Sequence, residues 1–338
     1  MRAVALMGPG KVELIDVPPP LCGEEDVLLR VEMVGLCGTD LNSFRGRNPL
    51  VSYPRIIGHE VSATVVKGTP DLVCGTHVTV SPYSECGQCA SCRRGRQNAC
   101  QHNQTLGVQR DGALTEFLAV PASRVYPSSL PLRDLCLVEP LTVGAHAVGR
   151  GKVTSADTVA VFGCGGVGLG AIAGAAFRGA RTVALDLDDG KLEIARAAGA
   201  TDLVNTARED YRQRLRELND GRGPDVVIEA IGLAETFRAA VEEVAFTGRV
   251  VYIGYAKEPI CYETKLFVQK ELTITGSRNA QPENFREVIA LLESGGFPVE
   301  AAISATVSMA DAPHILAEWS ANPAAFTKII VQTETAPE

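Results

Sequence analysis

One segment of this 338-residue chain restricts the possible folds more than any other, a glycine-rich turn between a β-like run and a helical run. The apolar run TVAVFG (158–163) leads into Gly163-x-Gly165-x-x-Gly168, and a small-residue helical pattern follows. Apolar runs of four to six residues then alternate with helical patterns farther along the chain. Short buried strands that alternate with helices are typical of βαβ units. We therefore predict a doubly wound domain with a parallel sheet over residues 144–290.

The spacing of the glycines indicates a dinucleotide site in this domain. The first glycine permits a tight turn, the second lets the backbone approach a pyrophosphate, and the third lets helix and strand pack closely. Asp186 ends the next apolar run, where its carboxylate can accept hydrogen bonds from an adenosine ribose. Its charge would repel a 2′-phosphate, so we predict NAD rather than NADP. Lys191 is placed to reach the same ribose, but a solvated helix lysine would give the same pattern.

The first part of the chain has a different texture. Short β-like runs such as 26–36 and 77–84 are separated by Gly and Pro turns, with few helical patterns. This favours a mainly antiparallel, barrel-like domain. The tail has a helical pattern at 285–295 and then a strand-like run, and we assign 1–143 and 291–338 to this domain. The predicted fold class is α/β, a doubly wound parallel-sheet (Rossmann) domain plus a mainly antiparallel β domain.

Composition and charge exclude several classes of partner. The chain is 46% hydrophobic and 21% charged, as is typical of soluble globular proteins. Its net charge of -8 argues against binding to nucleic acid or to anionic membranes, which needs a basic face. The opening apolar run ends at Gly8-Pro9-Gly10, too soon for a secretory signal, and no uncharged run approaches the length of a membrane span. We predict a cytoplasmic protein that binds neither nucleic acid nor membrane.

Four cysteines with the spacing C-x2-C-x2-C-x7-C form the densest cluster of potential metal ligands. They are Cys86, Cys89, Cys92 and Cys100. In a reducing compartment, such a cluster is more often a metal site than a disulfide framework. Four thiolates at this spacing fit a closed structural zinc site, and a four-thiolate iron–sulfur cluster is the alternative. His102 could replace one cysteine, although four cysteines already fill a tetrahedral shell. A closed zinc site does no chemistry, so the function must be encoded elsewhere.

Three other segments carry residues that could bind a metal ion or transfer a proton. They are GLCGTD with Cys37, Thr39 and Asp40, GHE with His59 and Glu60, and VEPLTVGAH with Glu139. Glu139 lies in an otherwise apolar run, where an unpaired charge would be costly. Taken singly, each residue has an ordinary structural explanation, such as a core thiol, a turn histidine or a surface charge.

Taken together, these motifs resemble the zinc-dependent medium-chain dehydrogenases, the superfamily of alcohol and polyol dehydrogenases. GHE, the four-cysteine lobe, GCGGVG and the terminal KIIV run occur in the family's order over essentially the whole chain. VEPL resembles the sorbitol and threonine dehydrogenase branch, where a glutamate takes the place of a cysteine ligand. SYPRIIGHE and TGSRNAQPENF look most similar to bacterial sugar-acid dehydrogenases of the L-galactonate 5-dehydrogenase type. The resemblance implies that the β domain is a GroES-like barrel.

The resemblance also implies a catalytic zinc with one open coordination position. Cys37 and His59 would be two of its ligands, and either Glu60 or Glu139 the third. Binding both carboxylates would make the site anionic and weaken its Lewis acidity, so we expect the two to exchange or one to stand behind the metal. Asp40 would orient His59. With the structural site, the chain would hold two zinc ions.

The implied reaction is oxidation of an alcohol whose pKa the zinc lowers, with hydride transfer to the nicotinamide. The proton would leave through Thr39. Asn42 stands where many relatives have a relay histidine, so the relay would end in water or in the nicotinamide ribose. We predict an NAD-linked oxidoreductase that converts a secondary alcohol of a sugar acid or polyol to a ketone. The alternatives are a simple alcohol or threonine dehydrogenase and, in another class, a non-catalytic zinc- and nucleotide-binding regulatory protein.

The remaining predicted contacts involve substrate and cofactor. Arg278 and Asn279 in GSRNA are the substrate candidates, because a guanidinium group can hold a carboxylate with two hydrogen bonds. Weaker candidates are Arg45, Arg47, Arg55 and Arg110. The predicted cofactor-binding residues are Gly163, Gly165, Gly166, Val167, Gly168, Asp186, Lys191, Ile231, Gly254 and Lys328. We also predict a homotetramer, with a homodimer as the alternative.

Overall fold

The computed structural model describes residues 1–333 and divides the chain into two compact units. Unit 1 holds Met1–Glu139 together with the C-terminal segment from Val299, and unit 2 holds Pro140–Pro298. The sequence analysis placed the boundaries after residues 143 and 290. Among the described residues, no helix is both long enough and apolar enough to cross a bilayer.

Unit 2 is built on a parallel six-stranded sheet with the order β11-β10-β9-β12-β13-β14. The strands are β9 (Thr158–Phe162), β10 (Arg181–Asp186), β11 (Asp202–Asn205), β12 (Val226–Glu229), β13 (Arg249–Tyr252) and β14 (Thr273–Gly276). The chain starts at the central strand β9, proceeds outward to β11, and then returns to β12 on the other side of β9. Ligands of such sheets bind at the carboxyl ends of the strands, where this order reverses. The predicted doubly wound parallel sheet is confirmed.

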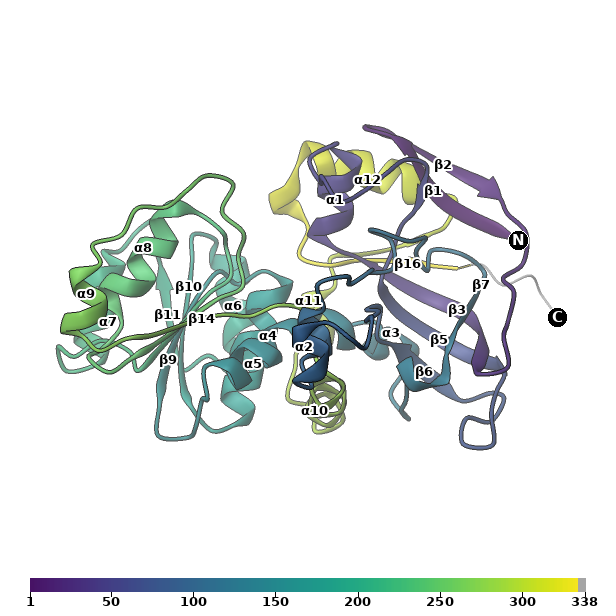
Figure 1. Cartoon of the computed structure of the whole chain (residues 1–338). Helices are drawn as coiled ribbons and strands as arrows, with labels where there is room; N and C mark the ends of the chain where they lie inside the picture. The colour runs from purple at the N-terminus through teal and green to yellow at the C-terminus, as the bar shows by residue number, and fades with distance from the viewer. Residues whose placement is uncertain (334–338) are drawn as a thin grey trace. The chain divides into compact units, whose positions relative to one another are not determined.

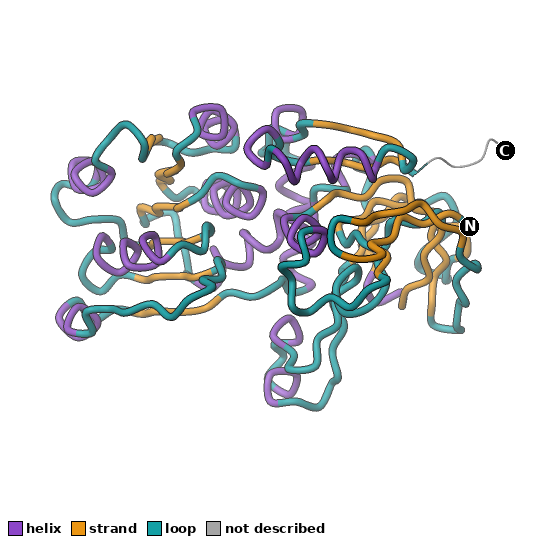
Figure 2. The backbone as a smooth tube through the Cα atoms, turned by 90° about the horizontal axis from the view of Figure 1, so that it is seen from above, coloured by secondary structure: helices purple, strands orange, loops and turns teal. Residues whose placement is uncertain are grey.

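Helices lie on both sides of this sheet (Figure 2). They are α4 (Val138–Arg150), α5 (Gly166–Phe177), α6 (Asp189–Ala197), α7 (Tyr211–Leu218), α8 (Ala234–Glu243), α9 (Lys265–Gln269) and α10 (Pro282–Glu293). Because both faces are covered, β9 and β12 are apolar and buried along most of their length, so they read as continuous apolar runs. The sequence analysis did not identify β11 or α7. Helix α7, YRQRLREL, buries only Leu215 and therefore has no apolar stripe to reveal it.

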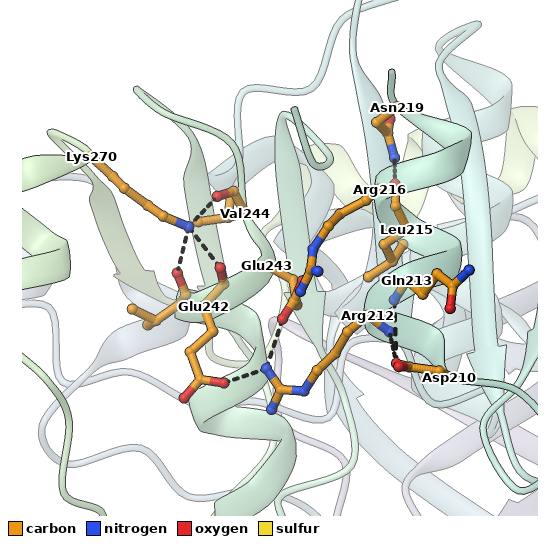
Figure 3. Close-up of polar contacts among 11 residues, drawn as sticks. Asp210, Arg212, Gln213, Leu215, Arg216, Asn219, Glu242, Glu243, Val244 and Lys270 are labelled. Atoms are coloured by element: carbon orange, nitrogen blue, oxygen red, sulfur yellow. Dashed lines mark hydrogen bonds and ion pairs between the residues drawn. The ribbon is translucent and has the colours of Figure 1, made fainter. Parts of the chain in front are cut away.

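Polar contacts hold α7 in place instead (Figure 3). Asp210 caps the helix by accepting hydrogen bonds from the backbone amides of its first turn. Arg212 on α7 pairs with Glu242 and Glu243 on α8, at 2.5 and 2.7 Å. The ammonium of Lys270 donates to the backbone carbonyl of Glu242, on the neighbouring helix α8, at 2.7 Å. The carboxyl end of a helix favours a cation in this position. The contacts of Asp210 and Arg212 explain how a mostly charged helix packs against the domain.

Unit 1 contains mainly antiparallel sheets. The larger has seven strands, in the order β15-β16-β3-β5-β6-β8 with β7 paired to β3, and the smaller has the order β2-β1-β4. The strands are β1 (Arg2–Gly8), β2 (Lys11–Asp16), β3 (Asp26–Leu36), β4 (Arg55–Ile56), β5 (Glu60–Lys67), β6 (His77–Val80), β7 (Phe117–Pro121), β8 (Val125–Pro127), β15 (Ala305–Ser308) and β16 (Ile329–Gln332). The C-terminal strand β16 lies beside β3 (Figure 1). The predicted antiparallel domain is confirmed.

The helical segments of unit 1 are short, as the sparse helical patterns indicated. They are α1 (Gly38–Phe44), α2 (Ala90–Arg93), α3 (Leu132–Leu135), α11 (Val299–Ala302) and α12 (Ala312–Ala321), with 3-10 turns at Gln97–Ala99, Ala122–Arg124 and Pro323–Ala325. The run 77–84 was expected to be one strand, but β6 ends at Val80. Pro82 has no amide hydrogen for a strand ladder, so the chain leaves the sheet there.

One partly buried ion pair in unit 2 generates a test of stability. Asp157 pairs with Arg249 and accepts hydrogen bonds from the amide and hydroxyl of Thr154 at 2.7 and 3.0 Å. Burial opposes the charge of Asp157, but these partners lower its pKa below the ordinary value. We expect Asp157→Asn to lower the free energy of unfolding at pH 7 by about 1–3 kcal/mol.

The pH dependence of this effect follows from the sign of the shift. A carboxylate whose pKa is lowered by folding stabilises the protein fully at pH values above its ordinary pKa of about 3.9. That contribution is lost as the pH falls through the pKa of the folded state. The stability difference between Asp157→Asn and the unsubstituted protein should therefore shrink in acid. Urea unfolding from pH 7 down to about pH 2 measures it, and a difference that stays constant below about pH 4 would contradict the assignment.

Candidate active site and metal centres

The register of three strands in unit 1 brings the candidate residues to one end of the sheet. Strand β3 pairs with β16 through Leu36 and Ile329, and with β5 through Gly35 and Glu60. Cys37 directly follows β3, His59 directly precedes β5, and Lys328 directly precedes β16. Antiparallel pairing therefore places residues from three distant segments around the end of β3.

Cys37, His59 and Glu60 form a compact set of potential metal ligands. One ligand atom from each lies within 4.8 Å of the others. Thr39 is adjacent, with its hydroxyl oxygen 3.7 Å from the Cys37 sulfur. The Nδ1 atom of His59 is buried and has no hydrogen-bond partner among the described residues, and coordination to a metal ion would satisfy such a nitrogen. A thiolate, an imidazole and a carboxylate suit zinc and leave one position open in a tetrahedral shell, so these residues fit a zinc ion.

Asp40 ties together the two segments that carry these ligands. Its side chain is completely buried, and its two oxygens accept hydrogen bonds from the backbone amides of Cys37 at 2.9 Å and Gly58 at 3.3 Å. We expected Asp40 to orient the ring of His59, and the structure shows that it holds the backbone on both sides of the site. Burial lowers the pKa of His59, but the charge of Asp40 and the Cys37 sulfur raise it, and the net shift is upward.

Lys328 neutralises the buried Glu60. The Glu60 carboxylate is 0% exposed, and the Lys328 ammonium lies 2.7 and 2.6 Å from its two oxygens. A Cβ atom at Gly35 would lie 2.1 Å from the nearer carboxylate oxygen, so only glycine leaves room for this contact. Burial lowers the pKa of Lys328, but Glu60 raises it, and the net shift is upward. We predicted a pyrophosphate contact for Lys328, and that role stays a prediction.

Glu139 has a different partner and lies outside the compact set. It is in the first turn of α4, is 4% exposed, and accepts a hydrogen bond from the phenolic hydroxyl of Tyr83. Burial raises the pKa of both Glu139 and Tyr83. The sequence analysis did not single out Tyr83. In the sequence, Tyr83 is marked only as an aromatic residue shortly before Cys86, the first cysteine of the cluster.

The four clustered cysteines converge on one point. Their sulfur atoms lie within 4.8 Å of one another, with separations of 3.4 Å for Cys89–Cys92, 3.9 Å for Cys89–Cys100 and 3.6 Å for Cys86–Cys100. A disulfide would require about 2 Å, whereas a tetrahedral zinc with Zn–S bonds of about 2.3 Å separates sulfurs by about 3.8 Å. The arrangement therefore fits a tetrathiolate metal site. His102 contributes its backbone amide, which donates to the Cys100 sulfur at 3.3 Å.

Hydrogen bonds prepare one of these thiols for metal binding. The hydroxyl of Ser91 lies 3.0 Å from the Cys89 sulfur. This contact, with the backbone amides of Cys92 and Gln101, lowers the pKa of Cys89 to about 5. Because a metal binds the thiolate and not the thiol, a lower pKa reduces competition from protons.

In unit 2, the glycine-rich loop has the geometry its spacing indicated. Gly163 has a φ of +99°, which favours glycine. A Cβ atom at Gly165 would meet nothing within 4 Å, so the backbone is open to a ligand at the start of α5. A Cβ atom at Gly168 would lie 1.8 Å from the carbonyl oxygen of Gly163. These observations match the three glycine roles of a dinucleotide-binding turn. Gly166 and Val167 form the first turn of α5 between them.

Asp186 is fixed at the carboxyl end of β10. Its oxygens accept hydrogen bonds from the backbone amides of Cys164 at 2.8 Å, Leu187 at 2.8 Å and Asp188 at 3.1 Å. The carboxylate is therefore bound directly to the glycine-rich loop. Lys191 lies in the first turn of α6, where its backbone amide donates to Asp188 at 3.0 Å.

The sequence analysis missed Glu229, a buried acid at the end of β12. It accepts hydrogen bonds from the amides of Ile231 at 2.9 Å and Gly232 at 2.7 Å, and from the hydroxyl of Thr236 at 2.7 Å. A Cβ atom at Gly254 would lie 2.4 Å from its other oxygen. Glu229 thus shapes the two loops that carry the predicted cofactor residues Ile231 and Gly254. A carboxylate at the end of the apolar run VVIE was the available signal.

The predicted substrate residues lie in unit 2 just after β14. Arg278 is exposed, and Asn279 has a φ of +53°. Arg45 donates to Ser320, Arg55 pairs with Asp111, and Arg110 donates to the carbonyl of Pro82. These three alternatives already make contacts within unit 1. The substrate role of Arg278 and Asn279 stays a prediction.

Comparison with known proteins identifies the family. The family model of a zinc-binding dehydrogenase matches residues 166–294, and that of an alcohol dehydrogenase GroES-like domain matches 23–131. An L-galactonate-5-dehydrogenase from Escherichia coli K12 is 35% identical over 280 residues, which cover 82% of each chain. The chain belongs to the zinc-type medium-chain dehydrogenases. An uncharacterized zinc-type alcohol dehydrogenase-like protein from Haemophilus influenzae is 35% identical over 335 residues, 97% of this chain and 98% of that protein.

Solved structures agree with this family. An alcohol dehydrogenase from Escherichia coli CFT073, complexed with NADH, has a TM-score of 0.90 at 27% identity, covering 98% of this chain and 99% of the other. The protein is therefore a zinc-dependent oxidoreductase that acts on CH–OH groups, with zinc and a nicotinamide dinucleotide as cofactors. The GroES-like barrel and the Rossmann domain expected from the resemblance are confirmed.

Metal analysis tests the two proposed zinc sites separately. We expect the zinc content to fall from two ions per chain to one in Cys37→Ser and equally in Cys89→Ser, because each removes one thiolate ligand. A metal present at a thousand times its Kd stabilises the folded state by about 4 kcal/mol, so Cys89→Ser should also unfold at a lower temperature. The exposed Cys261 provides the control, since Cys261→Ser should keep both ions. Two ions in either ligand variant would refute that assignment.

Proposed function

We propose that this protein is an NAD-linked dehydrogenase that oxidises a secondary alcohol of a sugar acid or polyol to a ketone. The observation that carries the proposal is the set of Cys37, His59 and Glu60, with ligand atoms within 4.8 Å of one another and Thr39 beside them. Three donors of this kind leave one position for a substrate oxygen. The reaction removes a hydride to NAD⁺ and a proton to solvent.

The residues around this set have distinct roles in the proposal. When bound, zinc would act as a Lewis acid that lowers the pKa of the substrate hydroxyl. Thr39 can accept a proton from that hydroxyl and donate its own onward, because its oxygen is both donor and acceptor. Asn42 is exposed and cannot titrate, so the proton passes from Thr39 to water or the nicotinamide ribose. Asp40 holds the backbone of both ligand segments and keeps their spacing.

Glu60 is the third ligand in this proposal. It belongs to the compact set, whereas Glu139 lies outside it. One thiolate and one carboxylate neutralise the charge of a zinc ion. Lys328 supplies a further buried cation, which pairs with Glu60 on the side of unit 1 that carries the ligand set.

We also propose that NAD is preferred to NADP because of Asp186. Its carboxylate is held by three backbone amides, so it cannot easily turn away from a bound ribose. A 2′-phosphate beside it would suffer repulsion between like charges. The preference is thus a property of one fixed side chain.

Substitution of Asp186 tests this preference. We expect Asp186→Ala to raise kcat/KM for NADP relative to that for NAD by at least about tenfold, a change of about 1.4 kcal/mol in relative transition-state binding. Steady-state kinetics with both cofactors measures the ratio. Glu193→Gln, an exposed acid on α6, is the control and should leave the ratio unchanged. An unchanged ratio in Asp186→Ala would assign the discrimination to other residues.

The substrate class is proposed from the resemblance to sugar-acid dehydrogenases and from the cationic side chain of Arg278. A guanidinium can hold a carboxylate through two charge-assisted hydrogen bonds. A simple alcohol or threonine dehydrogenase is the alternative, and neither a simple alcohol nor a neutral polyol would need that cation.

Turnover of matched substrates distinguishes these possibilities. With zinc-loaded protein and NAD⁺, we expect aldonates to have a kcat/KM at least about tenfold above the polyols of the same configuration, and Arg278→Gln to remove that advantage. Absorbance of NADH measures the rates, with threonine and simple alcohols in the same panel. Arg238→Gln, an exposed arginine on α8, should retain the wild-type ratio. Faster turnover of the polyols would place the enzyme with the sorbitol dehydrogenases and remove the role of Arg278.

Assembly and cellular location complete the proposal. We propose a homotetramer, with a homodimer as the alternative, acting on a small molecule in the cytoplasm. Light scattering of the purified protein distinguishes the two assemblies.

A further inference from the structure

The carboxylate of Glu229, at the end of β12, has one satisfied and one unsatisfied oxygen. Its Oε1 atom accepts hydrogen bonds from two backbone amides and from the hydroxyl of Thr236. Its Oε2 atom is buried and has no hydrogen-bond partner among residues 1–333. The residue is 0% exposed, and its three donors are all uncharged groups. A buried carboxylate without a cationic partner is costly, so its presence here calls for an explanation.

Glu229 lies where the nicotinamide half of a bound dinucleotide is expected. Strands β10, β9, β12 and β13 are neighbours in that order. Asp186 ends β10 and the glycine-rich loop follows β9, so the adenosine ribose and the pyrophosphate are expected over these two strands. The nicotinamide half would then extend toward the carboxyl ends of β12 and β13.

Contacts join Glu229 to the loops around this region. Ile231 packs on the glycine-rich loop, since a Cβ atom at Gly163 would lie 2.7 Å from the Cγ1 atom of Ile231. The backbone carbonyl of Glu229 accepts hydrogen bonds from the amides of Ile253 at 2.9 Å and Gly254 at 3.2 Å, just after β13. A Cβ atom at Gly254 would lie 2.4 Å from Oε2 of Glu229. The unpartnered oxygen therefore lies against the backbone of a predicted cofactor residue.

The two forms of the cofactor differ in charge at the nicotinamide end. The ring carries a positive charge in NAD⁺ and none in NADH. A buried carboxylate acts on a nearby charge with less screening than a carboxylate on the surface. The charge of Glu229 would therefore stabilise bound NAD⁺ but not bound NADH.

We propose that the buried charge of Glu229 raises the affinity of this protein for NAD⁺ relative to NADH. This inference rests on the proposed function and deepens it. A site that favours the oxidised cofactor takes up NAD⁺ and releases NADH more readily, which suits the oxidation of an alcohol. In this way Glu229 acts on the direction of the reaction, whereas Asp186 acts on the choice between NAD and NADP.

Substitution by an amide of the same shape isolates the charge. In Glu229→Gln, the amide oxygen can accept the same three hydrogen bonds, but the negative charge is lost. We expect the ratio of the Kd for NAD⁺ to the Kd for NADH to rise about tenfold. Isothermal titration calorimetry of the zinc-loaded protein with each cofactor form measures both constants without turnover. An unchanged ratio would overturn the proposal.

Glu235→Gln is the matched control. It removes a negative charge from the first turn of α8, close to Glu229 in the sequence but exposed to solvent. Because water and salt screen an exposed charge, this variant should keep the ratio of the unsubstituted protein. A tenfold rise in Glu235→Gln as well would assign the effect to the general field of the domain and overturn the role of Glu229.

Glu229→Asp separates the charge from the shape of the side chain, and it remains decisive if Glu229→Gln does not fold. It keeps the carboxylate but shortens the side chain, so its hydrogen bonds to the loop are weakened. We expect both cofactor forms to bind more weakly, with the ratio of the two Kd values retained. A ratio raised about tenfold in Glu229→Asp would show that loop geometry sets the preference, and would overturn the proposal.

Failure of the underlying function is recognised separately. A protein that is not NAD-linked would bind neither NAD⁺ nor NADH before any substitution. Failure of this inference alone would leave both forms bound, with a ratio that does not respond to Glu229→Gln.

Discussion

The ion pair between Glu60 and Lys328 is the constraint on which the rest of unit 1 depends. A completely buried carboxylate is tolerated only with a partner, and breaking a buried pair typically costs about 3–5 kcal/mol. The partner comes from the C-terminal segment, so the pair requires β16, β3 and β5 to be aligned in one register. That register in turn requires a glycine at position 35, because the carboxylate occupies the space of its missing side chain. The position of the metal ligands follows from this alignment.

The three buried acids Asp40, Glu60 and Glu139 each accept hydrogen bonds from a different kind of donor. Asp40 takes two backbone amides, Glu60 an ammonium and Glu139 a phenol. In unit 2, Asp186 is held by three amides of the backbone. Because the donors are fixed by the fold, the carboxylates are held in place before any ligand binds, which is how preorganised sites limit the cost of binding.

The parts that the sequence predicted well are local. The glycine-rich loop is contained within six residues, and the four clustered cysteines lie within fifteen, so their spacing alone indicates their geometry. The contacts it missed join distant segments, since Lys328 and Glu60 are 268 positions apart and Tyr83 and Glu139 are 56 apart. No local pattern carries that information, because the first contact depends on strand register and the second on how a loop and a helix pack. Helix α7 was missed for another reason, since polar contacts replace the apolar stripe that would have marked it.

The division of unit 1 between the two ends of the chain has a consequence for its synthesis. Unit 2 is continuous in sequence, so it can fold as soon as it leaves the ribosome. Unit 1 must wait for β16, which follows unit 2 in the chain. Until then, one side of β3 near its end is an open sheet edge, and Glu60 has no counter-ion. The nascent enzyme therefore carries an exposed strand edge, a template for wrong pairing, until β16 has been made.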